Sequence, residues 1–339
     1  VHATLATFLG TFTFALMVLR SVQNRTDSTA AAVPAISITL CLVLTLTSVI
    51  MLTVFLDHLA KQLRVETMLR NVHRETTRTI ELVRSTTEEG PQEIAADTRP
   101  EQVNTVTAIR SGFLLAASRG RVISLASEFD LVVEEEHSIG SSVIAGVPLV
   151  AWWPRTGTVS EELDVEAFER SVRSAYAVGY ERTSSQDIGF GLRQLVDITI
   201  RALSPGVNDP TTAVHALSHV SAVLCLIAKL PPQPVAALDD DGVLRLIIRT
   251  HRFEALLNLA VQQPRQYGAA DPDVAARLFL LLREVALNTT VPAHREAIRL
   301  QWDALEISVA AAEFNSVERD RLTRLSGTVT DALNSLPAE

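Results

Sequence analysis

Lysine and cysteine are scarce in this 339-residue chain. Lys61 and Lys229 are its only lysines, and the formal net charge is −9. A general nucleic-acid binder needs a basic face, so this charge balance argues against nucleic acid as a partner. Cys41 lies in an apolar segment and Cys225 in an expected helix. Two cysteines in these places provide neither a disulfide framework nor a cysteine metal site.

The common catalytic motifs are also missing. We find no Walker phosphate loop, no Rossmann glycine fingerprint, no serine-hydrolase elbow and no HExxH zinc helix. This removes the common soluble enzyme classes, and we expect neither an enzyme nor a bound cofactor. His215 and His219 are four residues apart and could share a helix face, but no third metal ligand accompanies them. They are weak metal candidates, and surface or interhelical histidines are the simpler interpretation.

Long hydrophobic runs, by contrast, open the sequence. Val1–Leu19 is apolar apart from His2 and small threonines, and Val33–Leu56 carries no charge. At about 1.5 Å per residue, each is near the roughly 20 residues that cross a hydrocarbon core of about 30 Å. The first run lacks the basic leader and small-residue cleavage site of a signal peptide. We predict two transmembrane helices within residues 1–57 and a lipid bilayer as partner; two buried helices of a soluble core are the alternative.

Basic residues follow the second run. The loop between the runs carries Arg25 beside Asp27, whereas the segment after the second run carries Lys61, Arg64, Arg70, Arg74 and Arg78. The positive-inside rule therefore predicts that the C-terminal region is cytoplasmic. Residues 58–102 are expected to form a cytosolic helix and a linker. The helix either rests as an amphipathic element against the cytosolic domain, which we favour, or transmits motion or lines an ion vestibule.

The period of the apolar residues changes over residues 103–155, which predicts a small β-rich module. Strand candidates are the alternating residues 103–107 and the runs Leu131–Glu136 and Val143–Trp153, with a short helix at Ser118–Phe129. No lysine stands at its candidate turns, so a lipoyl or biotinyl carrier role is disfavoured.

Residues 161–339 are predicted to form an antiparallel helical bundle, because short breaks join the helical segments. The expected helices are Glu166–Gly179, Ser185–Leu203, Pro210–Leu230, Gly242–Gln262, Asp271–Leu287, Pro292–Ala312 and Val317–Leu336. Asp239–Gly242 lacks the spacing of a calcium loop and is expected to be a turn that caps the next helix. The predicted fold class is a membrane α-helical N-terminus plus a cytosolic α+β region, with the β-rich module before the bundle.

The stretch 182–219 of this bundle predicts a helix, a sharp break and a second helix. Ser-Pro-Gly at 204–206 stops the first helix, because proline lacks an amide hydrogen and glycine accepts a left-handed turn. Asp209 can cap the second helix, with Pro210 at its first position. The two glycines of the IGFG run at 188–191 would allow another helix to approach closely.

Polar residues are dense in the same stretch. They are Arg182, Gln186, Asp187, Arg193, Asp197, Arg201, Ser204, Asn208 and Asp209. Buried charges are costly unless they are paired and hydrogen-bonded. We favour an ion-pair lattice that locks the SPGVNDP turn against neighbouring helices or a neighbouring subunit. The alternatives are a pocket for an anion or nucleotide, formed by amides near Pro210 with Arg201 or Arg182, and a catalytic site.

Several short runs in this stretch carry a family signature. They are Arg182-Thr183, Gln186-Asp187, Phe190-Gly191, Leu195-Val196-Asp197, the run Arg201-Ala202-Leu203-Ser204-Pro205-Gly206, and Asn208-Asp209-Pro210 with Thr212-Ala213. With them the chain resembles the bacterial predicted membrane proteins catalogued as domain of unknown function 2254. The resemblance implies a multi-pass protein of the bacterial inner membrane, with another pair of membrane helices upstream of Val1. It implies no particular activity.

Two functional classes are compatible with these observations. In the first, which we favour, several copies assemble into a homo-oligomeric channel- or transport-like complex with a cytosolic regulatory domain. Thr4, Thr7 and Thr11 lie along one side of the first run and either line a polar path or pack helices together. Against a path for ions, neither run carries an internal ionisable residue apart from His2. In the second, the chain is a membrane-anchored, non-enzymatic sensor or scaffold that binds a partner or a small anionic ligand.

Overall fold

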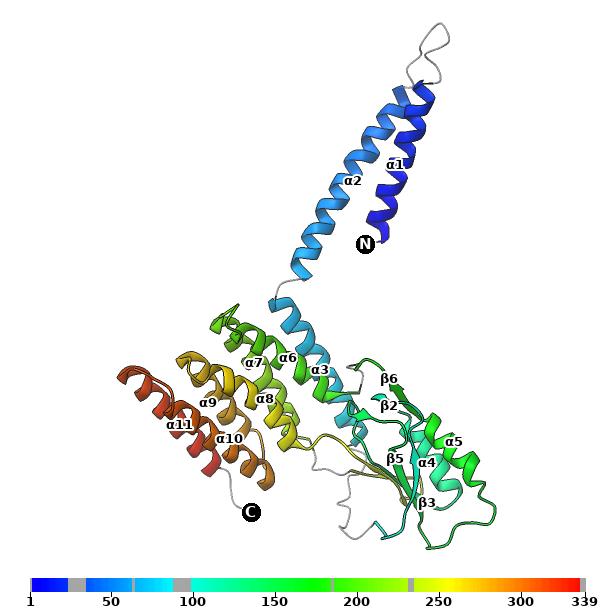
Figure 1. Ribbon diagram of the computed structural model, residues 1–339, viewed down its shortest axis with the longest axis vertical. Helices are drawn as coiled ribbons and strands as arrows, with labels where there is room; N and C mark the ends of the chain where they lie inside the picture. The colour runs from blue at the N-terminus through cyan, green and yellow to red at the C-terminus, as the bar shows by residue number, and fades with distance from the viewer. Residues whose placement is uncertain are drawn as a thin grey trace. The chain divides into compact units, whose positions relative to one another are not determined.

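The computed structural model describes residues 2–23, 35–62, 65–87, 99–183, 186–230 and 235–335. These residues form eleven helices and two β-sheets, so the mixed α+β class is confirmed (Figure 1). The chain divides into two compact units, Val1–Met68 and Leu69–Glu339. The loop between the two apolar runs and most of the predicted linker lie outside the described residues.

The first unit contains two long apolar helices, α1 (His2–Gln23) and α2 (Ala35–Gln62). Within α2, Ile36–Asp57 is long and apolar enough to cross a bilayer, with a mean hydropathy of 2.5, and Thr4–Arg20 of α1 is a shorter apolar helix. Large apolar side chains are exposed along both helices. A surface of this kind is typical of contact with lipid or another protein.

Small polar residues join α1 to α2. The less exposed positions of α1 include Thr4, Thr7 and Thr11, which are spaced by three and four residues. Thr11 Oγ1 lies 2.8 Å from Ser48 Oγ of α2, and both residues are buried. Faces of small residues let membrane helices approach closely. Thr11 therefore packs one helix on the other, which is one of the two roles predicted for the threonines.

Two β-sheets lie in the second unit. The five-stranded sheet has the order β1-β5-β3-β8-β7, with bounds Asn104–Thr107, Pro148–Pro154, Leu131–Glu135, Leu244–Ile248 and Val235–Leu238. The three-stranded sheet has the order β4-β2-β6, with bounds Ser142–Val143, Gly112–Ala117 and Tyr176–Gly179. Two helices, α4 (Arg119–Glu128) and α5 (Val165–Ser174), accompany the strands, and the rings of Trp152 and Phe168 lie 5.2 Å apart in their shared core. β1, β3 and α4 lie where strands and a short helix were predicted within 103–155, and the candidate Val143–Trp153 is divided into β4 and β5.

Two strands occupy positions where the sequence predicted helix, and a third, β7, lies inside the predicted bundle but outside any expected helix. β6 takes the end of the expected helix Glu166–Gly179, and β8 takes the start of the expected helix Gly242–Gln262. β7 precedes β8 as its antiparallel partner. An apolar run such as LRLII in β8 fits a buried strand as well as a buried helix. Pairing with β3, a strand from much earlier in the chain, decides the outcome, so the helix prediction is wrong here.

The acidic turn Asp239–Gly242 connects β7 to β8. The Asp239 carboxylate accepts hydrogen bonds from the backbone N–H groups of Asp241 (3.1 Å) and Val243 (2.9 Å), and Gly242 has a φ of +75°. The predicted turn is therefore present. The predicted helix cap is wrong, because a strand follows the turn.

The helices α6 to α11 share one hydrophobic core. Their bounds are Ile188–Leu203, Pro210–Ile227, Phe253–Gly268, Pro272–Ala286, Pro292–Ala310 and Ser316–Asn334. Figure 1 shows these helices on one side of the second unit and the strands on the other. Of the described helices, α7 also satisfies the length and hydropathy criteria for a membrane span, with a mean hydropathy of 1.4, but its buried face belongs to this core.

The amphipathic helix α3 (Val65–Thr87) rests on the same core through Leu69 and Ile80. Thr76 is buried opposite Gly191 of α6, where a Cβ atom would collide with Thr76 Oγ1. Two predictions are thereby confirmed. The helix packs against the domain that follows it, and a glycine of the IGFG run permits a close helix approach.

Candidate functional site

Asp187 is the capping residue at the start of α6, and its carboxylate contacts several neighbouring residues. Its carboxylate accepts a hydrogen bond from the backbone N–H of Phe190 at 2.9 Å and so caps the helix. Arg182 donates to the same carboxylate from Nε (2.9 Å) and a terminal nitrogen (2.7 Å), and the Asp187 side chain is only 1% exposed. The Arg182 guanidinium also lies over the Phe190 ring. A predicted pair of charged residues thus forms a buried, hydrogen-bonded ion pair.

Two loops, each following a strand of the five-stranded sheet, lie against Asp187. Gly140 follows β3 with a φ of +87°, and any Cβ atom there would collide with the Asp187 carboxylate. His251, between β8 and α8, places Nε2 2.9 Å from the carbonyl oxygen of Ile139 and 3.8 Å from Asp187 Oδ1. Its Nδ1 lies 3.3 Å from Ser138 Oγ. Because a carbonyl oxygen can only accept, the ring donates to Ile139 through Nε2, and its other nitrogen bonds to Ser138, which joins the sheet to the start of α6.

Gln186 adds another contact between the same parts. Its side-chain oxygen accepts a hydrogen bond from the backbone N–H of Ala117, the last residue of β2, at 3.2 Å. Gln186 therefore joins the start of α6 to the three-stranded sheet, and Asp187, paired with Arg182, joins it to loops that follow strands of the five-stranded sheet.

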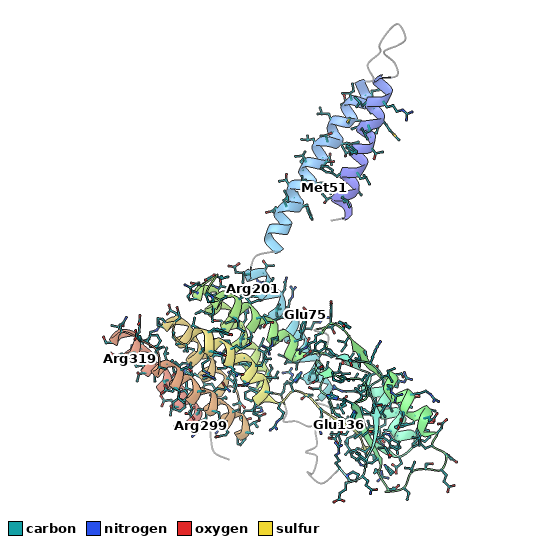
Figure 2. All side chains as sticks on the ribbon, viewed as in Figure 1. Met51, Glu75, Glu136, Arg201, Arg299 and Arg319 are labelled. Atoms are coloured by element: carbon teal, nitrogen blue, oxygen red, sulfur yellow. The ribbon has the colours of Figure 1, made fainter. Side chains whose placement is uncertain are left out.

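The other predicted polar residues lie elsewhere. Arg193 donates to Gln263 Oε1 of α8 at 3.0 Å, while Asp197 and Arg201 are exposed on α6 (Figure 2 labels Arg201). Ser204 donates to the carbonyl oxygen of Arg201 at 2.7 Å. At about 1.5 Å per residue, the 16 residues of α6 put roughly 24 Å between Asp187 and the far end of the helix, where Arg201 and Ser204 lie. The predicted set does not form one cluster.

The SPGVNDP turn is held by its own bonds. Asn208 has a φ of +48°, and the backbone N–H of Asp209 donates to the carbonyl oxygen of Ala202 at 2.8 Å. The Asp209 carboxylate accepts from the backbone N–H of Thr212, which caps α7 with Pro210 in its first turn, as predicted. Its bonds to Thr212 also lower the pKa of Asp209. The ion pair that the sequence placed around this turn lies at the opposite end of α6.

The paired histidines of α7 differ in environment. His215 is exposed, whereas His219 is half-buried, with its ring centroid 5.0 Å from that of His73 of α3. Burial, and then the charges of His73 and His215, lower the pKa of His219. Among the described residues, no group of three histidine, cysteine or acidic side chains could hold a metal ion.

A cavity of about 440 Å³ lies beside the Asp187 cluster. Its walls come from the strands, from α3 and α7, and from the starts of several helices; they include Ile123, Ile139, Ile188, Ile227, Ile248 and Leu256. Polar side chains among the lining residues are Arg119, Ser138, Gln186, Thr250, His251, Arg252, Glu254 and His294. The cavity is thus largely apolar, with a limited set of polar groups, which is the usual composition of a small-molecule site.

A buried ion pair supports one wall of the cavity. Arg119 donates from Nε and a terminal nitrogen to the two oxygens of Glu135, at 3.0 and 3.1 Å. The Glu135 side chain is 1% exposed, and Arg249 adds a backbone N–H at 3.3 Å. Burial raises the pKa of Glu135 despite the neighbouring guanidinium. This pair was not predicted from the sequence, although the three glutamates that follow the apolar run LVV of β3 were a signal for it.

His294 closes another part of the cavity. Its ring stacks on Phe253 with centroids 3.9 Å apart, and Nδ1 lies 3.0 Å from Thr289 Oγ1. Burial lowers the pKa of this histidine, which favours the neutral ring.

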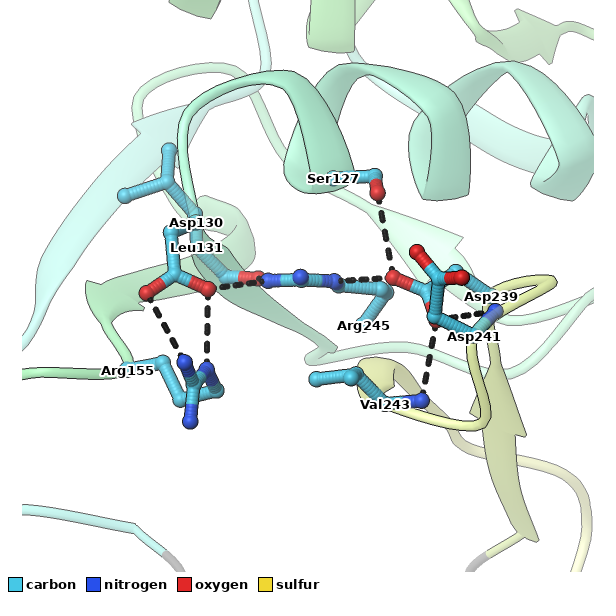
Figure 3. A network of polar contacts seen from close by, with 8 residues as sticks. All are labelled: Ser127, Asp130, Leu131, Arg155, Asp239, Asp241, Val243 and Arg245. Carbon is cyan, nitrogen blue, oxygen red and sulfur yellow. Dashed lines mark hydrogen bonds and ion pairs between the residues drawn. The ribbon is translucent and has the colours of Figure 1, made fainter.

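A charged network holds the β7–β8 hairpin that contributes Ala237 and Ile248 to the cavity (Figure 3). The nearly buried Arg245 donates to Asp239 and to Asp130, both at 2.7 Å. Arg155 also donates to Asp130, at 2.8 Å. The hydrogen bonds from Arg245 and from the turn backbone lower the pKa of Asp239 to about 2.

Comparison with known proteins places these features in a family context. A family described as predicted membrane protein (DUF2254) matches residues 1–284. Uncharacterised proteins of Mycobacterium bovis and Mycobacterium tuberculosis are each 31% identical over 318 residues, which cover 94% of this chain. The chain spans 60% of the length of these relatives. No solved structure matches the chain.

Proposed function

Because this chain belongs to the DUF2254 family of predicted membrane proteins, we propose that it is a membrane-anchored binding protein. In this proposal α1 and α2 sit in the bilayer, and the second unit binds a small molecule in the cavity beside Asp187 without transforming it. The observation that carries the proposal is the cavity, whose volume of about 440 Å³ falls within the roughly 300–1,000 Å³ of small-molecule sites.

The polar groups around the cavity favour binding over catalysis. Both ring nitrogens of His251 already have partners, Ile139 and Ser138, and Nδ1 of His294 contacts Thr289. A general base needs an unoccupied nitrogen within reach of the proton that it removes. His251 has no such nitrogen and is instead suited to hold the wall in place, whereas the contact of His294 with Thr289 engages one of its two ring nitrogens.

The proposed placement in the membrane rests on hydropathy and charge. Ile36–Asp57 can cross a bilayer, and α1 packs antiparallel to α2 through Thr11 and Ser48, so both helices would be membrane-spanning. Arg70, Arg74 and Arg78 are exposed on α3, which follows α2 in the chain. The positive-inside rule then favours a cytoplasmic second unit, in a bacterial inner membrane.

A homo-oligomeric channel- or transport-like assembly is the second candidate. The exposed apolar faces of α1 and α2 favour it, because they could contact other copies as well as lipid. Native mass spectrometry of the protein in detergent tests this candidate. A closed ring of four or more subunits would support a central pore, and a monomer or dimer would argue against one.

Binding itself is tested with the full chain in lipid nanodiscs. The protein is incubated with a bacterial lipid and metabolite extract, and bound molecules are identified by mass spectrometry. Ala293→Trp would fill the cavity from an exposed position in its lining. Ala222→Trp is the matched control, since Ala222 is exposed on α7 and is not among the lining residues. We expect at least one small molecule to be retained by the wild type and the control but not by Ala293→Trp; equal retention by all three would contradict the proposal.

A further inference from the structure

Four helices begin at the cavity. The lining includes Arg119 at the start of α4, Ile188 at the start of α6, Phe253 at the start of α8 and Ala293 at the start of α10. A helix N-terminus carries partial positive charge and amide hydrogens without partners in the helix. Asp187 caps α6, but no side chain within the described residues caps α4, α8 or α10. The starts of α4 and α10 therefore favour negative charge in the cavity, whereas Glu254 already places a carboxylate in the first turn of α8.

Arg119 supplies a formal positive charge at the same cavity. Its side chain is 27% exposed, and Glu135 takes two of the five N–H donors that a guanidinium carries. Among the described lining residues, the acidic group is Glu254, which pairs with Arg252 at 3.4 Å. The wall thus offers a cation held in place by a buried carboxylate, with donors left for a ligand.

Much of the remaining wall is apolar. Ile123 of α4, Ile227 of α7, Ile248 of β8 and Leu256 of α8 lie around the cavity. Burial of a ligand's hydrocarbon against such side chains is favourable, because it removes apolar surface from water. An anion without an apolar part would leave this surface unused.

We propose that the cavity binds an amphipathic monoanion of the fatty-carboxylate class, with its headgroup against Arg119 and the uncapped helix starts and its chain along the isoleucine wall. This inference rests on the proposed binding function and names its ligand class. A membrane protein meets such amphiphiles in its own bilayer.

The test compares four probes on the full chain in lipid nanodiscs by isothermal titration calorimetry. The probes are octanoate, octanol, octylammonium and acetate, and the signal of Ala293→Trp is subtracted to remove partition into the bilayer. We expect octanoate to bind at least tenfold more tightly than octanol, because charge-assisted hydrogen bonds are about twice as strong as neutral ones. Octylammonium and acetate should bind more weakly still.

Two variants examine the headgroup position. Glu135→Gln keeps a hydrogen-bond acceptor for Arg119 but removes the competing charge, so octanoate should bind more tightly than to the wild type. Arg119→Gln/Glu135→Gln replaces the ion pair by a neutral pair, which avoids an unpaired buried charge, and should bind octanoate roughly tenfold more weakly. Thermal unfolding of both variants in the absence of probe verifies that they fold.

The outcomes separate the two proposals. Binding of octanol or octylammonium as tight as that of octanoate, with all of it lost in Ala293→Trp, would overturn the anionic ligand class and keep the binding function. Unchanged octanoate affinity in the double variant would overturn the assignment of Arg119. If no probe binds the wild type above the Ala293→Trp signal, and the extract experiment also retains nothing, the binding function itself fails.

Discussion

Asp187 connects three parts of the second unit through a single carboxylate. It caps α6, pairs with Arg182 and lies against Gly140, where any Cβ atom would collide with the Asp187 carboxylate. Removing one member of a buried ion pair leaves the other uncompensated, at a cost of about 3–5 kcal/mol. The stability of this joint therefore depends on residues that touch Asp187 as well as on Asp187 itself.

Gly140→Ala tests this dependence. We expect the free energy of unfolding to fall by about 2–4 kcal/mol, because the new Cβ strains a positive φ and displaces the Asp187 carboxylate. Gly146→Ala is the matched control: its φ is +85°, and nothing lies within 4 Å of a Cβ built there. It should cost about 1–2 kcal/mol. Denaturant unfolding of the two variants gives the difference, and equal losses would show that Asp187 contributes nothing.

Asp239 makes stability depend on pH. Its pKa is lowered from 3.8 to about 2 by Arg245 and the turn backbone, so the stabilisation is fully present above pH 4 and is lost as pH falls through 2. Asp239→Asn should unfold more easily at pH 7 and show a flatter loss of stability between pH 4 and 2. Asp241→Asn, in the same turn, should follow the wild type. Thermal unfolding across pH 2–7 checks this, and parallel curves for Asp239→Asn and the wild type would contradict it.

At the scale of elements, the crossing of α3 over α6 joins the helix that follows α2 to the core of the second unit. Leu69 and Ile80, which precede and follow Thr76 on α3, are buried in the hydrophobic core, and Gly191 leaves the space that Thr76 occupies. Because interiors are close-packed, an added methyl group at such a crossing forces one helix away from the other.

Gly191→Ala should therefore loosen α3 and lower stability by about 1–3 kcal/mol. Thr76→Ala in the same chain should restore part of the loss, because it vacates the colliding position. Gly327→Ala is the control: Gly327 lies within α11 with open space around a Cβ, and alanine should stabilise that helix by up to about 1 kcal/mol. Hydrogen exchange of α3 measures the effect, and unchanged protection in Gly191→Ala would show that α3 is not held at this crossing.

For the whole molecule, the proposed orientation is testable by chemical labelling. Val317 is 75% exposed on α11. In a chain with Cys41→Ala and Cys225→Ala, a Val317→Cys residue should react with a membrane-impermeant maleimide only after the inner membrane is permeabilised. Reaction in intact spheroplasts would place the second unit outside the cytoplasm. A reporter cysteine in a soluble cytoplasmic protein serves as the permeability control.

The sequence by itself determined the features that depend on neighbours along the chain. The apolar run of α2, the amphipathic α3, and the helix-turn-helix with Asp209 and Pro210 at the start of α7 follow from local period and capping, which act within a few residues. The pairing of Arg182 with Asp187, five residues apart, is local as well.

Only the tertiary structure decided the rest. β8 is a strand because β3 lies beside it, and Arg119 meets Glu135 because α4 folds back on β3. The cavity exists because walls from segments throughout the second unit converge on it. These features depend on contacts between residues far apart in the chain, whose free energy no local pattern encodes, whereas caps and helical periods are set by hydrogen bonds within a turn or two.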